Sequence, residues 1–287
     1  MKLYPVAGAF GFASRASTTV ARVGQSPLGL TLQLVNDRME GTVSDGTNWT
    51  AALFAERAAP VGALAGKYNL LAAPPVPGLF IGPDMPAGYT FAPLTLSAAG
   101  RLSGTATLGE GTPAKILSTV SPNGAVPIYV SLYGGAGVIY GWLTFSNAFS
   151  TDLYGLLYWF KPGTVGGPLY PHGFTNGLFS SGSRYLPPAA GVPVLKLTNG
   201  VAFWGGGNLA NPISTPVTLG ADNKISASNQ LTLTFSAPKG TFTGSFVDPD
   251  SHAKRTLKGV VLPKQNLGAG QFLGPDQSGR IYIGNDD

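Results

Sequence analysis

The chain contains no cysteine and few of the other residues that carry metal or acid–base chemistry. Among its 287 residues there are 2 histidines, 3 methionines and 13 aspartates and glutamates. Without cysteine there can be no disulfide framework, thiolate nucleophile, iron–sulfur cluster or cysteine-ligated zinc site. The two histidines, His172 and His252, are far apart in the sequence, whereas catalytic zinc and non-haem iron usually need several imidazoles. We therefore expect no cofactor.

Charge is also scarce, because only 11% of the residues are charged and the net charge is +5. The basic residues are scattered singly, apart from a mild cluster at Lys254, Arg255, Lys258 and Lys264. Nucleic-acid binding needs a dense basic face, so we expect no nucleic-acid partner. No apolar run approaches the ~18 residues of a membrane helix, so we expect no membrane span.

The chain is instead rich in glycine, proline and aromatic residues, with 41 Gly, 24 Pro and 10% aromatics. Helix signals are nearly absent, and the best helical candidate is the segment 51–59, which ends before Pro60. Alternation of apolar and polar residues predicts strands at 30–34, 94–97, 137–145, 152–160 and 231–235. This pattern predicts an all-β protein whose sheets each place one face in a core.

A hairpin pattern recurs along the chain. The strands at 30–34, 94–97 and 231–235 are followed by 37–41, 100–104 and 240–244, which read Gly-x-apolar-x-Gly, with Asp37 replacing the first glycine. The first residue is expected to close a tight turn at positive φ. The second glycine is expected to leave room for a large side chain on the neighbouring strand.

The second and third copies of this pattern lie about half a chain length apart. This spacing predicts two related units, each a coiled antiparallel barrel or sheet. We place the first unit at residues 1–162 and the second at 163–287, with the boundary in the glycine- and proline-rich stretch 161–171. In a variant of this division, 66–162 forms a middle barrel and 1–60 completes the C-terminal unit.

Several segments resemble a known kind of protein. They are 66–71, 86–89, 153–162, 170–174, 258–263 and 268–274. Together they are similar to β-rich repeat regions of very large exported proteins of environmental bacteria, and more loosely to small lipoprotein β-barrels. The resemblance spans most of the chain but implies no activity and no site residues. With the low charge and absent cysteine, it favours a secreted or cell-surface protein whose signal peptide is not part of this sequence.

Carboxylates are few enough to be weighed one by one as catalytic candidates. Glu40 and Asp45 flank a turn beside Trp49, and two carboxylates over an aromatic floor could serve glycoside hydrolysis. A charged strand residue followed by an Asp-Gly hairpin turn explains the same pattern without catalysis. Asp248 and Asp250 could hold calcium, although their segment lacks the length and glycine of an EF-hand loop.

Aromatic residues supply the candidate ligand-binding positions. On the predicted strand 152–160, Asp152, Tyr154 and Tyr158 share one face, which would suit a sugar-binding platform or simply a barrel strand with both faces partly buried. Asp152 is also a catalytic candidate for a carboxylate-based hydrolase. The loop residues Tyr170, His172 and Phe174 form a second candidate, in which His172 would be a catalytic residue if the protein is an enzyme.

Trp204, which precedes three glycines, is expected to be a surface residue that contacts ligand. From these residues we expect a binding or structural module of a larger bacterial surface protein, with polysaccharide as its partner. The alternative is a hydrolase, a glycosidase or else an esterase, with a carboxylate-based site in a barrel mouth or a cleft between units. An outer-membrane barrel is a third reading, but the strands lack a clear lipid-facing apolar band.

Overall fold

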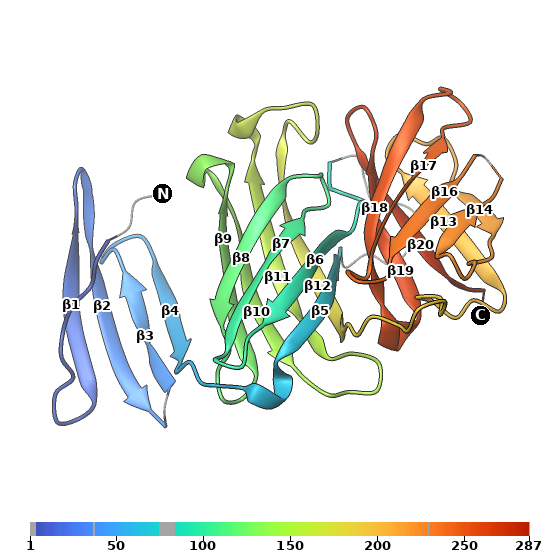
Figure 1. Ribbon diagram of the computed structural model, residues 1–287. Coiled ribbons are helices and arrows are strands. Elements are labelled where there is room, and N and C mark those ends of the chain that lie inside the picture. Colours follow the sequence, from blue (N-terminus) through green and yellow to red (C-terminus); the bar gives the residue numbers. More distant parts are fainter. Residues whose placement is uncertain (1–3, 37, 75–83, 229, 287) are drawn as a thin grey trace. The chain divides into compact units, whose positions relative to one another are not determined.

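The computed structural model describes residues 4–36, 38–74, 84–228 and 230–286, and in this part of the chain the fold is all-β. Three antiparallel sheets follow one another along the sequence (Figure 1). They belong to two compact units, Met1–Ala59 and Pro60–Asp287. No helix in the described ranges is long and apolar enough to cross a membrane.

The N-terminal sheet has four strands in sequential order, and it makes up the first unit. Its strands are β1 (Arg15–Arg22), β2 (Gln25–Val35), β3 (Arg38–Ser44) and β4 (Thr50–Glu56). Apart from Leu30, none of the described residues of this unit is buried, so the sheet encloses no core of its own. The helix expected over 51–59 is wrong, because β4 pairs with β3 along its whole length, and these hydrogen bonds outweigh alanine's helix propensity.

The middle sheet contains eight strands and curls into a nearly closed barrel. Its strands are β5 (Gly66–Ala73), β6 (Thr90–Leu96), β7 (Arg101–Thr107), β8 (Pro113–Thr119), β9 (Ala125–Leu132), β10 (Gly137–Phe145), β11 (Leu153–Pro162) and β12 (Gly173–Arg184). The strand order is β8-β7-β6-β5-β12-β11-β10-β9, so β5, the first strand of this sheet in the sequence, pairs with β12, the last. Where β8 meets β9, Ser118 Oγ donates a hydrogen bond to the carbonyl oxygen of Pro127.

The C-terminal sheet also contains eight strands and is strongly curled. Its strands are β13 (Gly200–Gly206), β14 (Ile213–Pro216), β15 (Lys224–Ser226), β16 (Thr232–Ser236), β17 (Thr241–Val247), β18 (Lys254–Leu262), β19 (Leu267–Leu273) and β20 (Ser278–Asn285). The order is β14-β13-β20-β19-β18-β17-β16-β15. A hydrogen bond of 2.6 Å between the hydroxyl groups of Thr215 and Ser228 bridges its two edges.

The recurring hairpins have the geometry that the glycine pattern predicts. Gly100 and Gly240 close their turns at φ of 78° and 63°. In the following strand Gly244 lies opposite Leu233, and a Cβ at Gly244 would approach the carbonyl oxygen of Thr232 to 2.0 Å. The equivalent glycines in β7 and β3 likewise face a leucine and leave no room for a Cβ. Asp37, which replaces the turn glycine in the first copy, lies outside the described residues.

The two eight-stranded sheets each enclose an apolar core, and a smaller third core joins them. The joining core comprises Leu71, Phe91, Val260, Leu262 and Ala269, so it is built from β5 and β6 on one side and β18 and β19 on the other. The two sheets lie side by side (Figure 1). Residue 162, where the sequence analysis placed a boundary, ends β11, which is hydrogen-bonded to β12 within the middle sheet. The sheets themselves change between Arg184 and Gly200.

Candidate ligand-binding surface

The outward face of four neighbouring strands in the middle sheet is covered with aromatic side chains. The strand registers align the outward residues of β9, β10, β11 and β12 in rows, and in one row Tyr129, Tyr140 and Tyr158 lie side by side. We call this surface the aromatic face, and define it by Tyr129, Tyr140, Trp142, Tyr154, Tyr158, Phe160 and Phe179. The alternation of these strands places their other side chains in the core.

These aromatic side chains are well exposed for residues of their size. Apart from the partly buried Trp142, their exposed fractions run from 41% for Phe160 to 64% for Tyr129. The rings of Tyr140 and Tyr158 stack with centroids 5.5 Å apart and an angle of 28° between their planes, so the two rings support each other. A cluster of exposed rings on one surface is a feature of binding sites, whereas single exposed apolar residues are ordinary.

The aromatic face carries no charge. Its other outward residues are Ala125, Pro127, Ser131, Val138, Thr144, Leu156, Thr175, Gly177 and Ser181, so each row is neutral. Comparison of the chain with protein-family models and with curated proteins finds no match. The ligand chemistry therefore has to be inferred from these residues themselves. Rings with hydroxyl groups, and no ionic partner, suit a neutral ligand with both apolar and hydroxylated faces.

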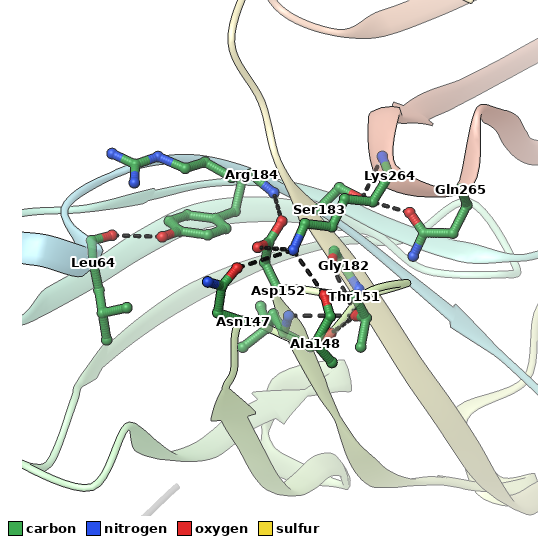
Figure 2. Close-up of polar contacts among 12 residues, drawn as sticks. Leu64, Asn147, Ala148, Thr151, Asp152, Gly182, Ser183, Arg184, Lys264 and Gln265 are labelled. Atoms are coloured by element: carbon green, nitrogen blue, oxygen red, sulfur yellow. Dashed lines mark hydrogen bonds and ion pairs between the residues drawn. The ribbon is translucent and has the colours of Figure 1, made fainter.

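Asp152 does not belong to this surface, although it precedes β11 on the same side of the alternation. Its carboxylate is buried and accepts a hydrogen bond from the backbone N–H of Arg184 at 2.8 Å. The other oxygen forms an ion pair of 2.8 Å with Lys264, which comes from the C-terminal sheet (Figure 2). The carboxylate predicted to bind sugar hydroxyls or act in catalysis is thus already occupied by a contact between the two sheets.

Further polar contacts around Asp152 strengthen this junction. The Lys264 ammonium group also donates to Asn147 Oδ1 at 3.2 Å and to the carbonyl oxygen of Ala148 at 2.8 Å. Next to it, Gln265 accepts a hydrogen bond from the Ser183 hydroxyl group (Figure 2). Together these bonds attach the β18–β19 turn to the end of the middle sheet.

The carboxylates predicted as a glycosidase pair are held by local contacts in the N-terminal sheet. Glu40 is exposed on β3, 3.6 Å from the guanidinium group of Arg38. Asp45 accepts hydrogen bonds from the Asn48 side chain and from three successive backbone N–H groups in the β3–β4 turn. The Asn48 side chain and these backbone donors hold the pKa of Asp45 well below its usual range. This geometry is that of an Asp-Gly turn, the second of the two explanations weighed for this pattern.

Asp248, a predicted calcium ligand, is likewise committed to a turn. Its carboxylate accepts hydrogen bonds from the Ser251 hydroxyl group at 2.5 Å and from Arg255 at 3.2 Å, while the backbone N–H groups of Asp250 and Ser251 supply two more. Asp250 itself is exposed. Nowhere in the described residues do three histidine, aspartate or glutamate side chains gather as metal ligands would.

The Asp248 turn makes stability depend on pH in a defined window. The hydrogen bond from Ser251, followed by the backbone donors and Arg255, lowers the pKa of Asp248 to about 2 from its ordinary 3.8. Because the folded-state pKa is the lower one, the stabilisation is complete above about pH 4 and is lost as pH falls through about 2. We expect Asp248→Asn to lower the melting temperature at pH 7 and to have little effect near pH 2. A melting difference that is equal at both pH values would contradict this.

Three of the aromatic residues predicted to contact ligand are core residues instead. Tyr170 and Phe174 are 3% and 9% exposed, and Phe174 packs edge-on against Trp159 with centroids 4.7 Å apart. The Tyr170 hydroxyl group accepts a hydrogen bond from the backbone N–H of Ser278 at 2.7 Å, and burial raises the pKa of this tyrosine. Trp204 is fully buried, so the prediction of a surface tryptophan is wrong. It lies on the same inward face of β13 as Ala202, and its ring packs against Phe246 with centroids 5.6 Å apart.

His172, the remaining catalytic candidate, is exposed. It lines a small cavity of about 210 Å³ together with Asp84, Asp276 and Gln277. Asp276 accepts a hydrogen bond of 2.6 Å from Asn208. The other three catalytic candidates, Glu40, Asp45 and Asp152, are each held by an ion pair or by hydrogen bonds. His172 lines a cavity, and its side chain has no ion pair or hydrogen bond with another described residue.

A buried ion pair that the sequence analysis did not predict closes one end of the middle sheet. Glu110 and Lys161 are 3% and 5% exposed, and their charged groups lie 2.8 Å apart. Lys161 also donates to the carbonyl oxygen of Leu169 at 2.7 Å. The Tyr133 hydroxyl group donates to Glu110 and accepts a hydrogen bond from Trp159 at 3.2 Å. Burial, and then the Glu110 carboxylate, raise the pKa of Tyr133 above its usual range.

Sequence reasoning found part of the aromatic face and missed the rest. Tyr154 and Tyr158 were predicted, and both are exposed on the outward side of β11. Tyr129 and Phe179 were not predicted. Tyr129 stands between the buried apolar residues Ile128 and Val130, and this alternation was the signal that the sequence offered. Phe179 gave a weaker signal, because one of its buried neighbours, Ser180, is polar. The rows themselves depend on strand register, which a single sequence does not reveal.

Proposed function

We propose that this chain is a binding module of a larger exported bacterial protein and that its aromatic face binds a neutral polysaccharide. The observation that carries the proposal is the set of exposed rings over β9–β12 without a single charged side chain among them. Pyranose rings have apolar faces that pack on aromatic side chains, and tyrosine hydroxyl groups can exchange hydrogen bonds with sugar hydroxyl groups. Low overall charge, the absence of cysteine and the resemblance to exported repeat regions support the proposal that the chain is part of an exported protein.

A ligand that spans several strands fits the dimensions of the aromatic face. Neighbouring strands lie about 4.8 Å apart, so the row through Tyr129, Tyr140 and Tyr158 presents rings at short regular intervals. A linear polymer can contact successive rings along such a row, and each additional sugar adds to the buried area. A single monosaccharide would cover only part of it, so we expect affinity to rise with chain length.

The test is a depletion assay with insoluble neutral polysaccharides, using cellulose, starch, chitin and a β-1,3-glucan. We expect Tyr140→Ala and Tyr158→Ala each to weaken binding about tenfold, since an aromatic contact contributes about 0.5–1.5 kcal/mol beyond its area. Trp49→Ala is the control, because Trp49 is 43% exposed but belongs to the N-terminal sheet. It should bind like the unaltered protein.

Other ligands for the aromatic face would give different results in the same experiment. Binding to phospholipid vesicles but to no polysaccharide would refute the proposal and indicate a membrane surface. A concentration-dependent dimer that Tyr158→Ala dissociates would indicate that the face binds a second copy. Equal loss of polysaccharide binding in Trp49→Ala would also refute it, because the effect would not be specific to these rings.

A further inference from the structure

The outward face of the C-terminal sheet offers a second surface whose chemistry differs from that of the aromatic face. A cleft of about 380 Å³ lies along β18 and β19, where they meet the end of β7 and the loop that follows it. We call it the basic cleft, and define it by Lys254, Thr256 and Lys258 of β18, Gln271 of β19, and Thr107 and Gly111 of the middle sheet.

Positive charge in the basic cleft comes from two lysines. Lys254 and Lys258 are exposed on the outward side of β18, and neither forms an ion pair with a carboxylate of the described residues. Their nearest acidic neighbour along the chain, Asp250, is exposed in the preceding turn and does not line the cleft. The two ammonium groups therefore remain available to a ligand.

Two other charged residues near the basic cleft, Arg255 and Glu110, already have ionic partners. Arg255 also lines the cleft, but its guanidinium group donates to Asp248 at 3.2 Å. Glu110 precedes Gly111 in the β7–β8 loop, and its carboxylate is turned inward to Lys161 at 2.8 Å. No carboxylate among the described lining residues opposes the two lysines, so the cleft carries a net positive charge.

The spacing of these charges indicates the shape of the ligand. Lys254 and Lys258 are four residues apart on one strand, which places their Cα atoms about 13 Å from each other. One small anion cannot contact both groups, whereas an extended polymer with repeated negative charges can. Between the lysines lies the hydroxyl group of Thr256, and Gln271 of β19 pairs with Lys258 across the strands. Gln271 is 4% exposed, and its Oε1 lacks a hydrogen-bond partner among the described residues.

We propose that the basic cleft binds an acidic polysaccharide through carboxylate or sulfate groups held by Lys254 and Lys258. The hydroxyl group of Thr256 and the amide of Gln271 would then bond to the sugar hydroxyl groups. A nucleic acid is the other common linear polyanion, but single strands bind by stacking on exposed rings. Among the described residues that line the cleft, the one with a ring is Phe272, which is 1% exposed and lies in the core. This site is separate from the aromatic face, and the proposal does not rest on neutral-polysaccharide binding.

The test measures binding of sulfated dextran to the full chain by titration calorimetry at low and moderate salt. We expect the double variant Lys254→Gln/Lys258→Gln to lose at least tenfold in affinity and to show a weaker dependence on salt. The matched control is Lys196→Gln/Lys239→Gln, which removes the same two charges from exposed positions outside the cleft. Its affinity for sulfated dextran should stay within about twofold of that of the unaltered protein, because the net charge of the protein by itself contributes little to binding.

Measurements with other ligands and variants distinguish this proposal from alternative ligands for the basic cleft. Neutral dextran and inorganic sulfate should bind at least tenfold more weakly than sulfated dextran, and Tyr140→Ala/Tyr158→Ala should bind sulfated dextran normally. The proposal is overturned by equal losses in both lysine variants, by no binding of sulfated dextran, or by tighter binding of a homopolymeric single-stranded oligonucleotide. Circular dichroism and melting curves establish that each variant is folded.

Discussion

Replacing Lys161 by methionine is expected to lower the free energy of unfolding by about 3–5 kcal/mol, the largest single effect we foresee. The methionine side chain fills a similar volume, but it leaves the Glu110 carboxylate buried at 3% exposure without its cation. The carbonyl oxygen of Leu169 loses a donor at the same time. Urea denaturation monitored by tryptophan fluorescence measures the loss, because Trp159 is part of the same network.

Two further variants separate the buried charge from the loss of a lysine as such. Lys115→Met changes an exposed lysine on β8 of the same sheet and should shift the unfolding midpoint only slightly. The double variant Glu110→Gln/Lys161→Met removes the uncompensated charge and should recover part of the stability, as replacing a whole buried pair usually does. If Lys161→Met unfolds at the same urea concentration as Lys115→Met, the pair is not a stabilising contact.

Replacing Gly244 by alanine is expected to lower the free energy of unfolding by about 1–3 kcal/mol. The new Cβ would lie 2.0 Å from the carbonyl oxygen of Thr232 and 2.6 Å from Leu233, so the paired strands must move apart. Gly177→Ala is the matched change. Its Cβ would meet nothing closer than Leu156 at 3.7 Å, and it removes a flexible residue from a strand, so it should be neutral or slightly stabilising.

Thermal melting of the two alanine variants side by side measures this difference. Equal melting temperatures would mean that the repeated glycine has no role in strand packing. A greater loss in Gly244→Ala would support the interpretation that the Gly-x-apolar-x-Gly pattern records a steric requirement. The same reasoning extends to Gly104, whose Cβ would lie 2.4 Å from the carbonyl oxygen of Pro93.

Several strands could be predicted because a strand with one buried face alternates apolar and polar residues along the sequence. The alternation at 137–145 predicted β10, and the structure follows that alternation, since Ile139 and Leu143 are buried and Tyr140 is exposed. The hairpin glycines could be predicted for the same local reason, because turn φ angles and cross-strand crowding involve near neighbours. The segment 51–59 was misassigned, because its alanines carry no strong period and pairing with β3 decided its state.

The candidate sites were harder to predict, because exposure depends on which residues meet across the fold. The Tyr154 and Tyr158 positions followed from alternation, and both proved exposed. Tyr170 and Trp204 looked like loop aromatics, yet packing against distant strands buries them. Glu110 and Lys161, separated by 51 positions, gave no local signal of their pairing.

By itself the sequence determined the all-β class, the turn glycines, the absence of thiol chemistry and the strands where apolar and polar residues alternate. These follow from single residues and from periods of two, which act over short stretches of chain. Only the tertiary structure decided which strands pair, and therefore which rings share the aromatic face, which lysines line the basic cleft and which carboxylates are neutralised. The physical reason is that register and contacts between sheets are set by the packing of whole sheets, to which residues far apart in the sequence contribute together.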